Sequence, residues 1–453
     1  MTRPEPRAAG KRKAALMADK RKKEFDLLVI GNGVAGNAAA LAARKADPNL
    51  GIAVVEELPY REYAAGALPD YLAGHLAKED VFMADDPLKR TISFFPGVRV
   101  ESVDPKRKCV TTNGGRAMRY GKLILALGST PIQLRKMQGT GLPGNFVLKT
   151  VEDAERIAAY TAQRAPAKRA VVVGSGAIGT ESALALAELG IAVTIVELLE
   201  WVNKKALDLV TADRVVKELR AKNITVYTGE NVVAVEGKNR VEAAVTSKRV
   251  IPCGLIIWAV GVRPVVDLAV QAGVTLGETG GIKTDEHMRV NLPDIYACGD
   301  CTESVDQFRQ KPVLNMLWAS AARQGAVAGS HAAGMDATFD TSSAVLITYI
   351  GDKPLVAFGA TEADLAGASY ELLEREAQDS YSRVLLQGGR IVGAQMLNTM
   401  EGVALLLAQH KKGGPVERDP AQIQEHIRYP AQQAALAAYL DRFASRRIRQ
   451  RKQ

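Results

Sequence analysis

Cysteine is scarce in this sequence, and the few that occur are scattered. The 453 residues contain four, Cys109, Cys253, Cys298 and Cys301. So few thiols exclude a disulfide-stapled scaffold and are typical of a protein from a reducing cytoplasm. They also argue against an iron–sulfur cluster, because its four thiolates would use every cysteine in the chain. No metal site is predicted, since neither Cys109 nor Cys253 has ligand-like spacing.

A long hydrophobic run is also lacking. The longest apolar stretch, residues 253–262, is far too short to cross a bilayer and is typical of a buried strand. No apolar signal-peptide core is found near the N-terminus. We therefore expect a cytoplasmic protein without a membrane span. The length is that of roughly three globular domains.

The positive charge of the chain lies at its two ends. Residues 1–24 hold nine Lys or Arg against three acidic residues, and residues 440–453 hold six against one. The part between them is slightly negative, so no basic nucleic-acid surface is expected there. Neither end interleaves the aromatic residues that base stacking needs. The ends are either solvated extensions or docking segments for an acidic partner.

Two segments of the sequence share one plan. The first spans 26–57 and is completed by 122–131, and the second spans 169–200 and is completed by 254–264. Each contains an apolar run, a G-x-G-x-x-G turn, an Ala/Leu-rich helix and a second apolar run that ends in Glu. Each is completed by an apolar run that enters a glycine turn. The repetition predicts a duplicated α/β fold with two dinucleotide sites.

The three glycines of each turn have different tasks. The first allows a tight turn, the second lets the backbone approach a pyrophosphate, and the third lets the helix pack on its strand. They are Gly31, Gly33 and Gly36 in the first copy and Gly174, Gly176 and Gly179 in the second. Free N–H groups and the dipole of the helix N-terminus then favour the phosphates. Glu56 and Glu197 end the second strands, where a carboxylate accepts ribose hydroxyls and repels a 2′-phosphate.

The order of these motifs resembles that of the pyridine nucleotide–disulfide oxidoreductase superfamily. "IYACGDC" (295–301) lies beyond the second copy, which is therefore inserted between parts of the first. Over roughly 25–415 the chain is similar to the branch with NADH oxidases, coenzyme A disulfide reductases, and rubredoxin and ferredoxin reductases. The resemblance implies an FAD-dependent NAD(H) oxidoreductase of the α/β class. It would have two Rossmann-like domains, the NAD domain inserted in the FAD domain, and a C-terminal α+β interface domain that dimerises.

The resemblance also implies the domain boundaries and the role of each copy. The domains would be a basic extension (1–24), the FAD-binding domain (25–150 and 280–335), the NAD-binding domain (151–279), the interface domain (336–415) and a helical basic extension (416–453). In the extension at the C-terminus, Leu436, Tyr439, Leu440 and Phe443 share one helical face. That helix would either pack on its own body or dock on another subunit.

The residues that the resemblance assigns to the cofactors form two sets. The FAD set consists of Gly31, Gly33, Val34, Ala35, Gly36, Glu56, Val100, Ala126, Gly128, Asp300 and Trp318. The NAD set consists of Gly174, Gly176, Ile178, Gly179, Glu197 and Gly261. Glu181 matches a position near the nicotinamide, the alternative being polar packing of its helix. Lys204 and Lys205 follow Glu197 closely and leave the strictness of NADH over NADPH open.

The reactive cysteine of many relatives has no counterpart here. Members that reduce coenzyme A disulfide or form water from oxygen carry it in a segment like "SFxxCALPY". This chain has "EYAAGALPDYLAG" (62–74), with Gly66 at the cysteine position. Glycine cannot attack a disulfide or form a sulfenic acid, so we name no catalytic side chain and expect the flavin itself to react. Tyr63, Tyr71 and His75 would either pack beside the flavin or contact a partner.

Cys298 and Cys301 form a C-x-x-C pair around Asp300. A thiol at a helix start can have a lowered pKa, so the pair could be a redox-active dithiol. The resemblance instead makes Asp300 the functional residue, on the ribityl chain of FAD, and makes the cysteines small packing residues.

These observations lead to one hypothesis and two alternatives. The chain would exchange electrons between NADH and an iron–sulfur protein or subunit, for instance as the flavin subunit of a tungsten-dependent aldehyde oxidoreductase complex. The basic extensions would then contact the acidic or iron–sulfur partner. The alternatives are a stand-alone NADH oxidase that forms peroxide and a non-catalytic flavoprotein that senses NADH.

Overall fold

The structure, a computed structural model, describes residues 23–84, 87–134, 136–162, 168–306, 308–339 and 344–416. They form two compact units. Unit 1 contains the described residues up to Tyr63, Met83–Ser129, and those from Pro264 to 339. Unit 2 contains Ala64–Phe82, the described residues of Thr130–Arg263, and those from 344 onwards. The predicted helix after 416 and most of the N-terminal extension lie outside the described residues.

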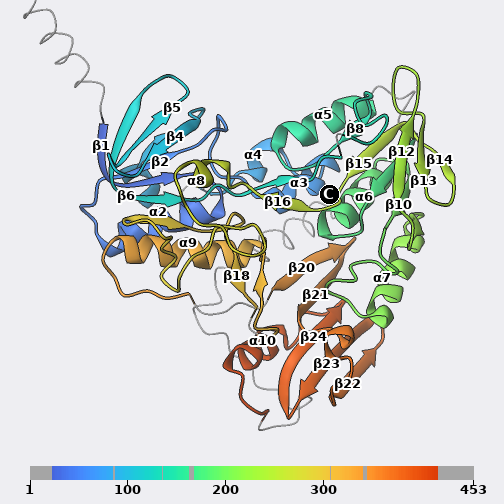
Figure 1. Cartoon of the computed structure of the whole chain (residues 1–453). Helices are drawn as coiled ribbons and strands as arrows, with labels where there is room; N and C mark the ends of the chain where they lie inside the picture. Colours follow the sequence, from blue (N-terminus) through green and yellow to red (C-terminus); the bar gives the residue numbers. More distant parts are fainter. Residues whose placement is uncertain are drawn as a thin grey trace, which may run out of the picture. The chain divides into compact units, whose positions relative to one another are not determined.

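Unit 1 is built on a seven-stranded sheet (Figure 1). Five parallel strands run in the order β3-β2-β1-β6-β17, and β5 and β4 extend the sheet from β6 in antiparallel fashion. The strands are β1 (Lys23–Ile30), β2 (Ile52–Val55), β3 (Ser93–Phe95), β4 (Val100–Asp104), β5 (Cys109–Thr112), β6 (Ala117–Leu125) and β17 (Ile295–Ala297). The apolar runs 27–30 and 52–55 are fully buried, as expected for parallel strands covered on both faces.

Two helices of unit 1, α2 (Val34–Ala46) and α9 (Trp318–Ala332), lie side by side (Figure 1). Small residues allow the close approach. A Cβ at Gly325 would lie 2.1 Å from the carbonyl oxygen of Ala35, and one at Gly329 would lie 2.0 Å from that of Ala39. Helix α9 is therefore packed directly on α2, the helix of the first glycine turn.

Unit 2 contains a second parallel sheet with the order β11-β10-β9-β15-β8. Its strands are β8 (Asn145–Phe146), β9 (Arg169–Val173), β10 (Ala192–Val196), β11 (Thr225–Tyr227) and β15 (Leu255–Trp258). The order β10-β9-β15 repeats β2-β1-β6 of unit 1, as the duplicated motif predicts. The associated helices are α5 (Val151–Ala162), α6 (Ala177–Glu188) and α7 (Leu209–Ala221), and an antiparallel sheet is formed by β12 (Val232–Glu236), β13 (Ala243–Thr246) and β14 (Val250–Pro252).

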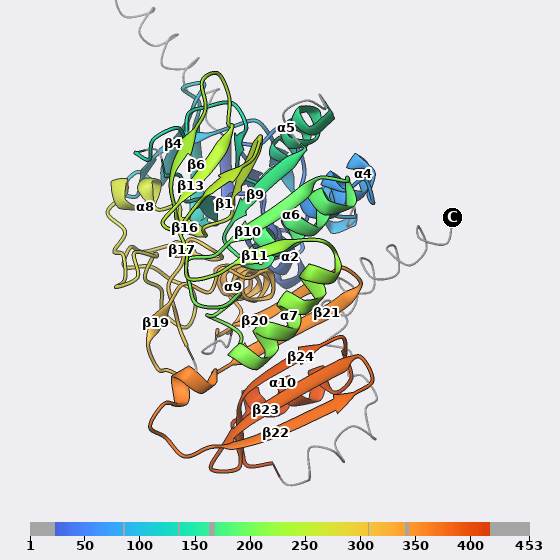
Figure 2. The ribbon, with the colours of Figure 1, turned by 90° about the vertical axis from the view of Figure 1, so that its right-hand side faces the viewer.

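The C-terminal part of unit 2 is an antiparallel sheet with the order β20-β21-β24-β23-β22. Its strands are β20 (Val345–Ile350), β21 (Lys353–Gly359), β22 (Glu371–Ala377), β23 (Ser380–Gln387) and β24 (Arg390–Leu397). Helix α10 (Val403–Lys412) packs on β24 and ends at Gly413, whose φ is 68°. A sheet with one helix agrees with the α+β character that the resemblance implies for this part of the chain. Helix α7 contacts β20 and β24, so it joins this sheet to the parallel one (Figure 2).

The segment Ala64–Phe82 belongs to unit 2, although the sequence places it between strands of unit 1. It contains η1 (Ala65–Ala67), α3 (Leu68–Leu72) and α4 (Lys78–Val81), and α3 contacts α5 and α6. The remaining short elements are η2 (Pro87–Thr91), β7 (Ser129–Pro131), β16 (Val262–Pro264), α8 (Asp267–Gln271), β18 (Ser304–Val305), β19 (Pro312–Val313) and η3 (Glu362–Leu365).

The fold class predicted from the sequence, mixed α/β with two Rossmann-like sheets, is confirmed. The predicted boundaries between the domains stay predictions. No helix in the described part of the chain is long and apolar enough to cross a membrane.

Candidate dinucleotide sites

The first glycine turn, between β1 and α2, requires glycine at two positions. Gly31 has a φ of +104°, and a Cβ there would lie 2.1 Å from the carbonyl oxygen of Ala126. A Cβ at Gly36 would lie 1.9 Å from the carbonyl oxygen of Gly31. Because real Cβ atoms do not approach backbone oxygens so closely, both glycines are fixed by the packing of the turn itself.

The turn between β9 and α6 repeats this geometry. Gly174 has a φ of +99°, and a Cβ there would lie 2.4 Å from the carbonyl oxygen of Ala259. A Cβ at Gly179 would lie 2.1 Å from the carbonyl oxygen of Gly174. The two copies thus use glycine for the same two contacts.

The middle glycines, Gly33 and Gly176, are different. Their φ values, −71° and −64°, are ones that any residue adopts. A Cβ at either position would meet no atom of the described residues within 4 Å, apart from its own helix and chain neighbours. Both are N-caps, and no described side chain caps α2 or α6. The space and the N–H groups of the first helical turn therefore fit a dinucleotide pyrophosphate at each turn.

The acidic residues after β2 and β10 are held by equivalent amides. The Glu56 carboxylate accepts hydrogen bonds from the backbone N–H groups of Asn32 (2.6 Å) and Leu58 (2.8 Å). The Glu197 carboxylate accepts them from Ser175 and Leu199, both at 2.8 Å. Each carboxylate is thus fixed beside its glycine turn and keeps acceptor capacity for a ribose hydroxyl.

The loop after β17 is held by a buried glutamine. The side-chain oxygen of Gln324, on α9, accepts hydrogen bonds from the Gly299 N–H (2.7 Å) and the Thr302 hydroxyl (2.8 Å). Its amide donates to the Ser304 hydroxyl at 2.9 Å. Asp300 lies in this loop, and its carboxylate accepts a hydrogen bond from the Ser129 hydroxyl at 2.7 Å.

Sequence reasoning missed Gln324 and Ser129. Gln324 is only 1% exposed. In the sequence it stands among the small, mostly apolar residues of "WASAARQGAVAG", and this contrast is the signal from which it could have been predicted. Ser129 follows directly on Gly128, in the predicted flavin contact "LALGSTP".

The other predicted FAD residues lie in unit 1. Val34 and Ala35 form the first turn of α2, Ala126 follows β6, and Trp318 begins α9. Gly128 has a φ of +69°. Val100 begins β4, and the Val98 N–H, just before it, donates to the Glu56 carbonyl oxygen at 2.8 Å. Their roles stay predictions.

The remaining predicted NAD residues lie in unit 2. Ile178 is in the first turn of α6, and Gly261, with a φ of +106°, follows β15. Glu181 accepts a hydrogen bond from the Thr348 hydroxyl at 2.6 Å, which links α6 to β20. Glu181 also lines a small pocket together with His75 and Tyr349.

Gly66 does not need to be glycine for the sake of the backbone. It is exposed and lies in η1, a 3₁₀ turn, where φ is negative. A residue with a side chain, such as cysteine, would fit the same backbone. The backbone conformation alone therefore does not require glycine at this position.

The aromatic residues near Gly66 are engaged in local contacts. The Tyr71 hydroxyl donates to Glu155 on α5 at 3.4 Å. His75 Nε2 lies 2.7 Å from Glu188 on α6, and its Nδ1 lies 3.5 Å from Asp70. Tyr63, in unit 1, makes an edge contact with Tyr60 at 5.7 Å between ring centroids. These polar contacts tie Tyr71 and His75 to helices of unit 2, and the alternatives of packing beside the flavin and contacting a partner stay predictions.

The C-x-x-C thiols are buried on different sides of the unit 1 sheet. Cys298 belongs to the core that contains α2 and α9, and Cys301 belongs to the core on the other face. Burial raises the pKa of Cys301 to about 11 and that of Cys298 well above its usual value. Burial therefore favours the protonated form of both thiols, which argues against a dithiol shuttle.

The other two cysteines also provide no reactive pair. All four are free. Cys253 is buried, which raises its pKa to about 12, and Cys109 lies half-buried on β5. Among the described residues no group of three or more His, Cys, Asp or Glu could hold a metal ion.

Two sheets with parallel strands at their centre, each with the same turn and the same fixed carboxylate, define a protein that binds two dinucleotides. Comparison with known families gives the same class. Residues 25–325 match the family described as "Pyridine nucleotide-disulphide oxidoreductase", and the chain belongs to this family. The family is FAD- and NAD(H)-dependent, which confirms the predicted enzyme class and cofactor pair.

Similar proteins carry several different names. An NADH oxidase of Methanocaldococcus jannaschii is 33% identical over 342 residues, 74% of this chain and 76% of that protein. The ferredoxin reductase subunit of 5,5′-dehydrodivanillate O-demethylase from Sphingobium sp. is 30% identical over 406 residues, 87% of this chain and 95% of that protein. The solved NAD-dependent persulfide reductase of A. fulgidus has a TM-score of 0.80 and 28% identity, covering 86% of this chain and 77% of that one.

Proposed function

We propose that this protein passes electrons between NADH and an external one-electron carrier, an iron–sulfur protein or subunit, through a flavin and without a protein thiol. The observation that carries the proposal is that the chain offers few accessible cysteine side chains. Gly66 stands where the resemblance implies a reactive cysteine, and three of the four cysteines that the chain does have are buried. Disulfide or sulfenic acid chemistry needs an accessible thiolate, which these residues do not supply.

The residues of unit 1 would hold FAD. The Gly33 turn would receive its pyrophosphate, Glu56 its ribose, and Asp300 its ribityl chain. When bound, FAD accepts a hydride from NADH and can return the two electrons singly. Gln324 would position the loop of Asp300, and the N-terminus of α9 would stabilise negative charge on the reduced ring.

The residues of unit 2 would hold NADH. The Gly176 turn would receive the pyrophosphate and Glu197 the adenosine ribose. The overall reaction is NADH plus two oxidised carriers to NAD⁺, one proton and two reduced carriers. Because each carrier takes one electron, the balance needs no disulfide and no further co-reactant.

The ferredoxin reductase subunit among the relatives supports a carrier of this kind, since it aligns with almost its whole length. The basic segments 1–24 and 416–453 would attract an acidic carrier or subunit. We further propose that the protein works in the cytoplasm, as part of a larger complex such as a tungsten-dependent aldehyde oxidoreductase. That last step is an analogy based on fold.

The experiment compares electron acceptors for one preparation. The FAD-loaded protein is mixed with NADH, and turnover is followed with a [2Fe–2S] ferredoxin, with dioxygen and with coenzyme A disulfide. We expect the ferredoxin to support turnover at least tenfold faster than the other two. Equally fast turnover with coenzyme A disulfide would overturn the thiol-free route. A native preparation without any co-eluting metal subunit would overturn the complex.

A second candidate function is an NADH oxidase that releases peroxide. It is favoured by the relative of that name at 33% identity. Such an enzyme would be reoxidised by air alone, and one peroxide would form for each NADH consumed. Fast reoxidation by air without a carrier would support this function over the first.

A further inference from the structure

The loop that follows Glu197, residues 198–207, occupies the side of the second turn where NADH and NADPH differ. We name it the ribose loop. It connects β10 to α7 and carries Lys204 and Lys205, the cations closest in sequence to Glu197. A 2′-phosphate is normally bound by a cation in this part of a dinucleotide site. The position of these lysines therefore bears on the choice between the two nucleotides.

Ser175 ties the ribose loop to the carboxylate of Glu197. Its hydroxyl donates to Glu197 Oε2 at 2.6 Å and accepts a hydrogen bond from the backbone N–H of Asn203 at 3.2 Å. Ser175 is fully buried. One hydroxyl thus connects the ribose-binding carboxylate with the middle of the loop.

The corresponding residue of the first copy does not do this. Asn32 also donates its backbone N–H to the carboxylate, but its side chain accepts from the Asn37 side chain at 2.8 Å. Glu56 therefore has two described donors, whereas Glu197 has three. The hydroxyl link is a property of the second copy and is not needed to fix the carboxylate itself.

Within the ribose loop, Lys204 is held by two neighbours. Its ammonium lies 2.6 Å from a carboxylate oxygen of Glu200 and 4.2 Å from the ring centroid of Trp201. The Trp201 indole N–H donates to the Leu207 carbonyl oxygen at 2.8 Å, which closes the loop on itself. The lysine charge is thus compensated inside the loop by a carboxylate and an aromatic face.

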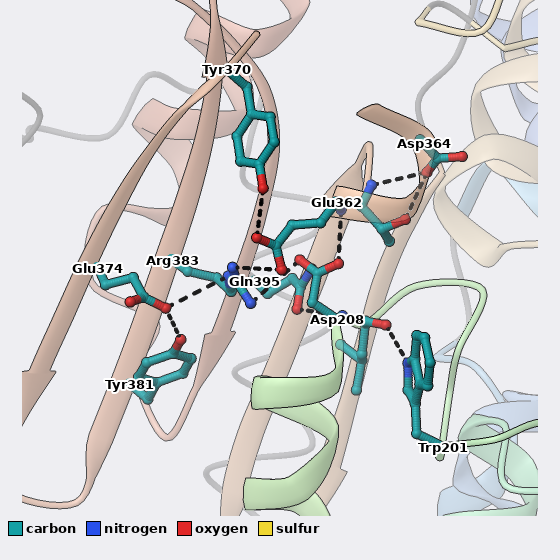
Figure 3. A network of polar contacts seen from close by, with 11 residues as sticks. Trp201, Asp208, Glu362, Asp364, Tyr370, Glu374, Tyr381, Arg383 and Gln395 are labelled. Carbon is teal, nitrogen blue, oxygen red and sulfur yellow. Dashed lines mark hydrogen bonds and ion pairs between the residues drawn. The ribbon is translucent and has the colours of Figure 1, made fainter. Parts of the chain in front are cut away.

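The far end of the ribose loop is anchored in the C-terminal sheet at Asp208 (Figure 3). Its carboxylate accepts hydrogen bonds from the Glu362 N–H (2.8 Å) and the Gln395 amide (2.7 Å), and Gln395 accepts the Asp208 N–H at 3.0 Å. Arg383 lies 3.5 Å from the same carboxylate. Asp208 is 2% exposed and Arg383 1%.

This anchor places charged groups in the interior: Asp208 and Arg383 are buried, and Arg383 Nε and Nη1 have no hydrogen-bond partner among the described residues. Arg383 also lies 3.1 Å from Glu362, so removing any one partner would leave a charge in the interior. The network includes strands β23 and β24, which are far from α7 in the sequence (Figure 3). The loop therefore cannot shift at Asp208 without disturbing the sheet.

We propose that Ser175 and Asp208 are positioning residues that lock the ribose loop and thereby make the site selective for NADH. The locked loop keeps Lys204 on Glu200 and Trp201, so it cannot neutralise a 2′-phosphate that Glu197 repels. Unlocking the loop, or freeing Lys204, admits NADPH. The proposal rests on the assignment of the second turn to NAD(H).

The test measures the specificity ratio, kcat/KM for NADPH over kcat/KM for NADH, from flavin reduction under argon. Ser175→Ala removes the hydroxyl link, and Glu200→Gln frees Lys204 without touching the buried core. We expect each change to raise the ratio roughly tenfold, the value of one charge-assisted contact, mainly through the KM for NADPH. Ser175→Thr, which keeps a hydroxyl, should leave the ratio near that of the wild type.

Ser182→Ala is the matched control. Ser182 is also a fully buried serine of the second copy, on α6, and its hydroxyl has no hydrogen-bond partner among the described residues. Its loss should leave the ratio unchanged. Asp208→Asn should raise the ratio if the variant folds. If it does not fold, Glu200→Gln at the exposed position decides.

A ratio within twofold of the wild type for both Ser175→Ala and Glu200→Gln would overturn the proposal, and so would an equal rise for Ser182→Ala. These outcomes differ from a failure of the proposed function. If the wild-type protein itself does not reduce its flavin with either nucleotide, the assignment of the second turn is wrong, and the ratio is not defined.

Discussion

Alanine substitution of the middle glycine of each turn should weaken the binding of one cofactor and leave the binding of the other unchanged. Gly33→Ala adds a Cβ at the first turn, and Gly176→Ala adds one at the second. Neither Cβ would meet another part of the described chain within 4 Å, and both φ values suit alanine. We expect Gly33→Ala to be purified with little flavin, and Gly176→Ala to keep its flavin but bind NADH weakly.

The magnitudes follow from the two turns. Fixing alanine in place of glycine stabilises the fold by about 0.4–1 kcal/mol through the unfolded state, whereas alanine is a poorer N-cap by a similar amount. The free energy of unfolding of the apoprotein should therefore change by less than about 1 kcal/mol. A methyl group forced into the space of a bound pyrophosphate costs about 1–3 kcal/mol, or roughly 5- to 150-fold in affinity.

The control is the third glycine of each turn. A Cβ at Gly36 or Gly179 would lie 1.9 or 2.1 Å from a backbone oxygen, so these alanine variants should lose stability before any ligand is added. The assays are the flavin-to-protein ratio, NADH binding by titration, and thermal unfolding of the apoprotein. The reasoning is refuted if Gly33→Ala keeps full flavin, or if Gly176→Ala loses flavin and keeps its affinity for NADH.

Three further predictions concern single groups. Burial raises the pKa of Cys301 to about 11, so roughly one Cys301 thiol in a thousand is ionised at pH 8, and it raises the pKa of Cys298 as well. Both should therefore react with a thiol reagent far more slowly than Cys109 until the protein unfolds. Fast labelling of either would contradict their burial. Gly66→Cys should fold, keep its flavin and gain one rapidly titrated thiol; loss of the fold would show that the turn needs glycine. Tyr120→Phe removes a buried hydroxyl without a hydrogen-bond partner among the described residues, and chemical unfolding should find the variant as stable as the wild type or more stable by about 1 kcal/mol; a loss of more than that would reveal a partner for the hydroxyl.

The parts of the sites that could be predicted from the sequence are those in which the interacting residues are close along the chain or belong to a known motif. Gly36 must be glycine because a Cβ there would lie 1.9 Å from the carbonyl oxygen of Gly31, five residues earlier, and that spacing is visible in the sequence. The fixed carboxylates follow because the second strand of a Rossmann unit always ends beside the turn.

The parts that could not be predicted join distant positions. Ser129 and Asp300 are 171 residues apart, and Asp208 and Gln395 are 187 apart. No periodicity or motif marks such pairs, because each depends on how the fold brings distant segments of the chain together. The same holds for the segment Ala64–Phe82, which packs with α5 and α6 although it follows β2 in the sequence. A polar residue within a helix of small apolar residues, such as Gln324 in α9, is the sequence signal that can indicate such a long-range contact.

The most direct test of the thiol-free route is a reductive titration of the FAD-loaded protein with NADH under argon, followed by absorbance. The flavin should be fully reduced by one equivalent of NADH, and an added [2Fe–2S] ferredoxin should then reoxidise it with two equivalents. A protein with a redox-active disulfide or sulfenic acid would consume a second equivalent of NADH before or during flavin reduction. Uptake of two equivalents per flavin would contradict the account.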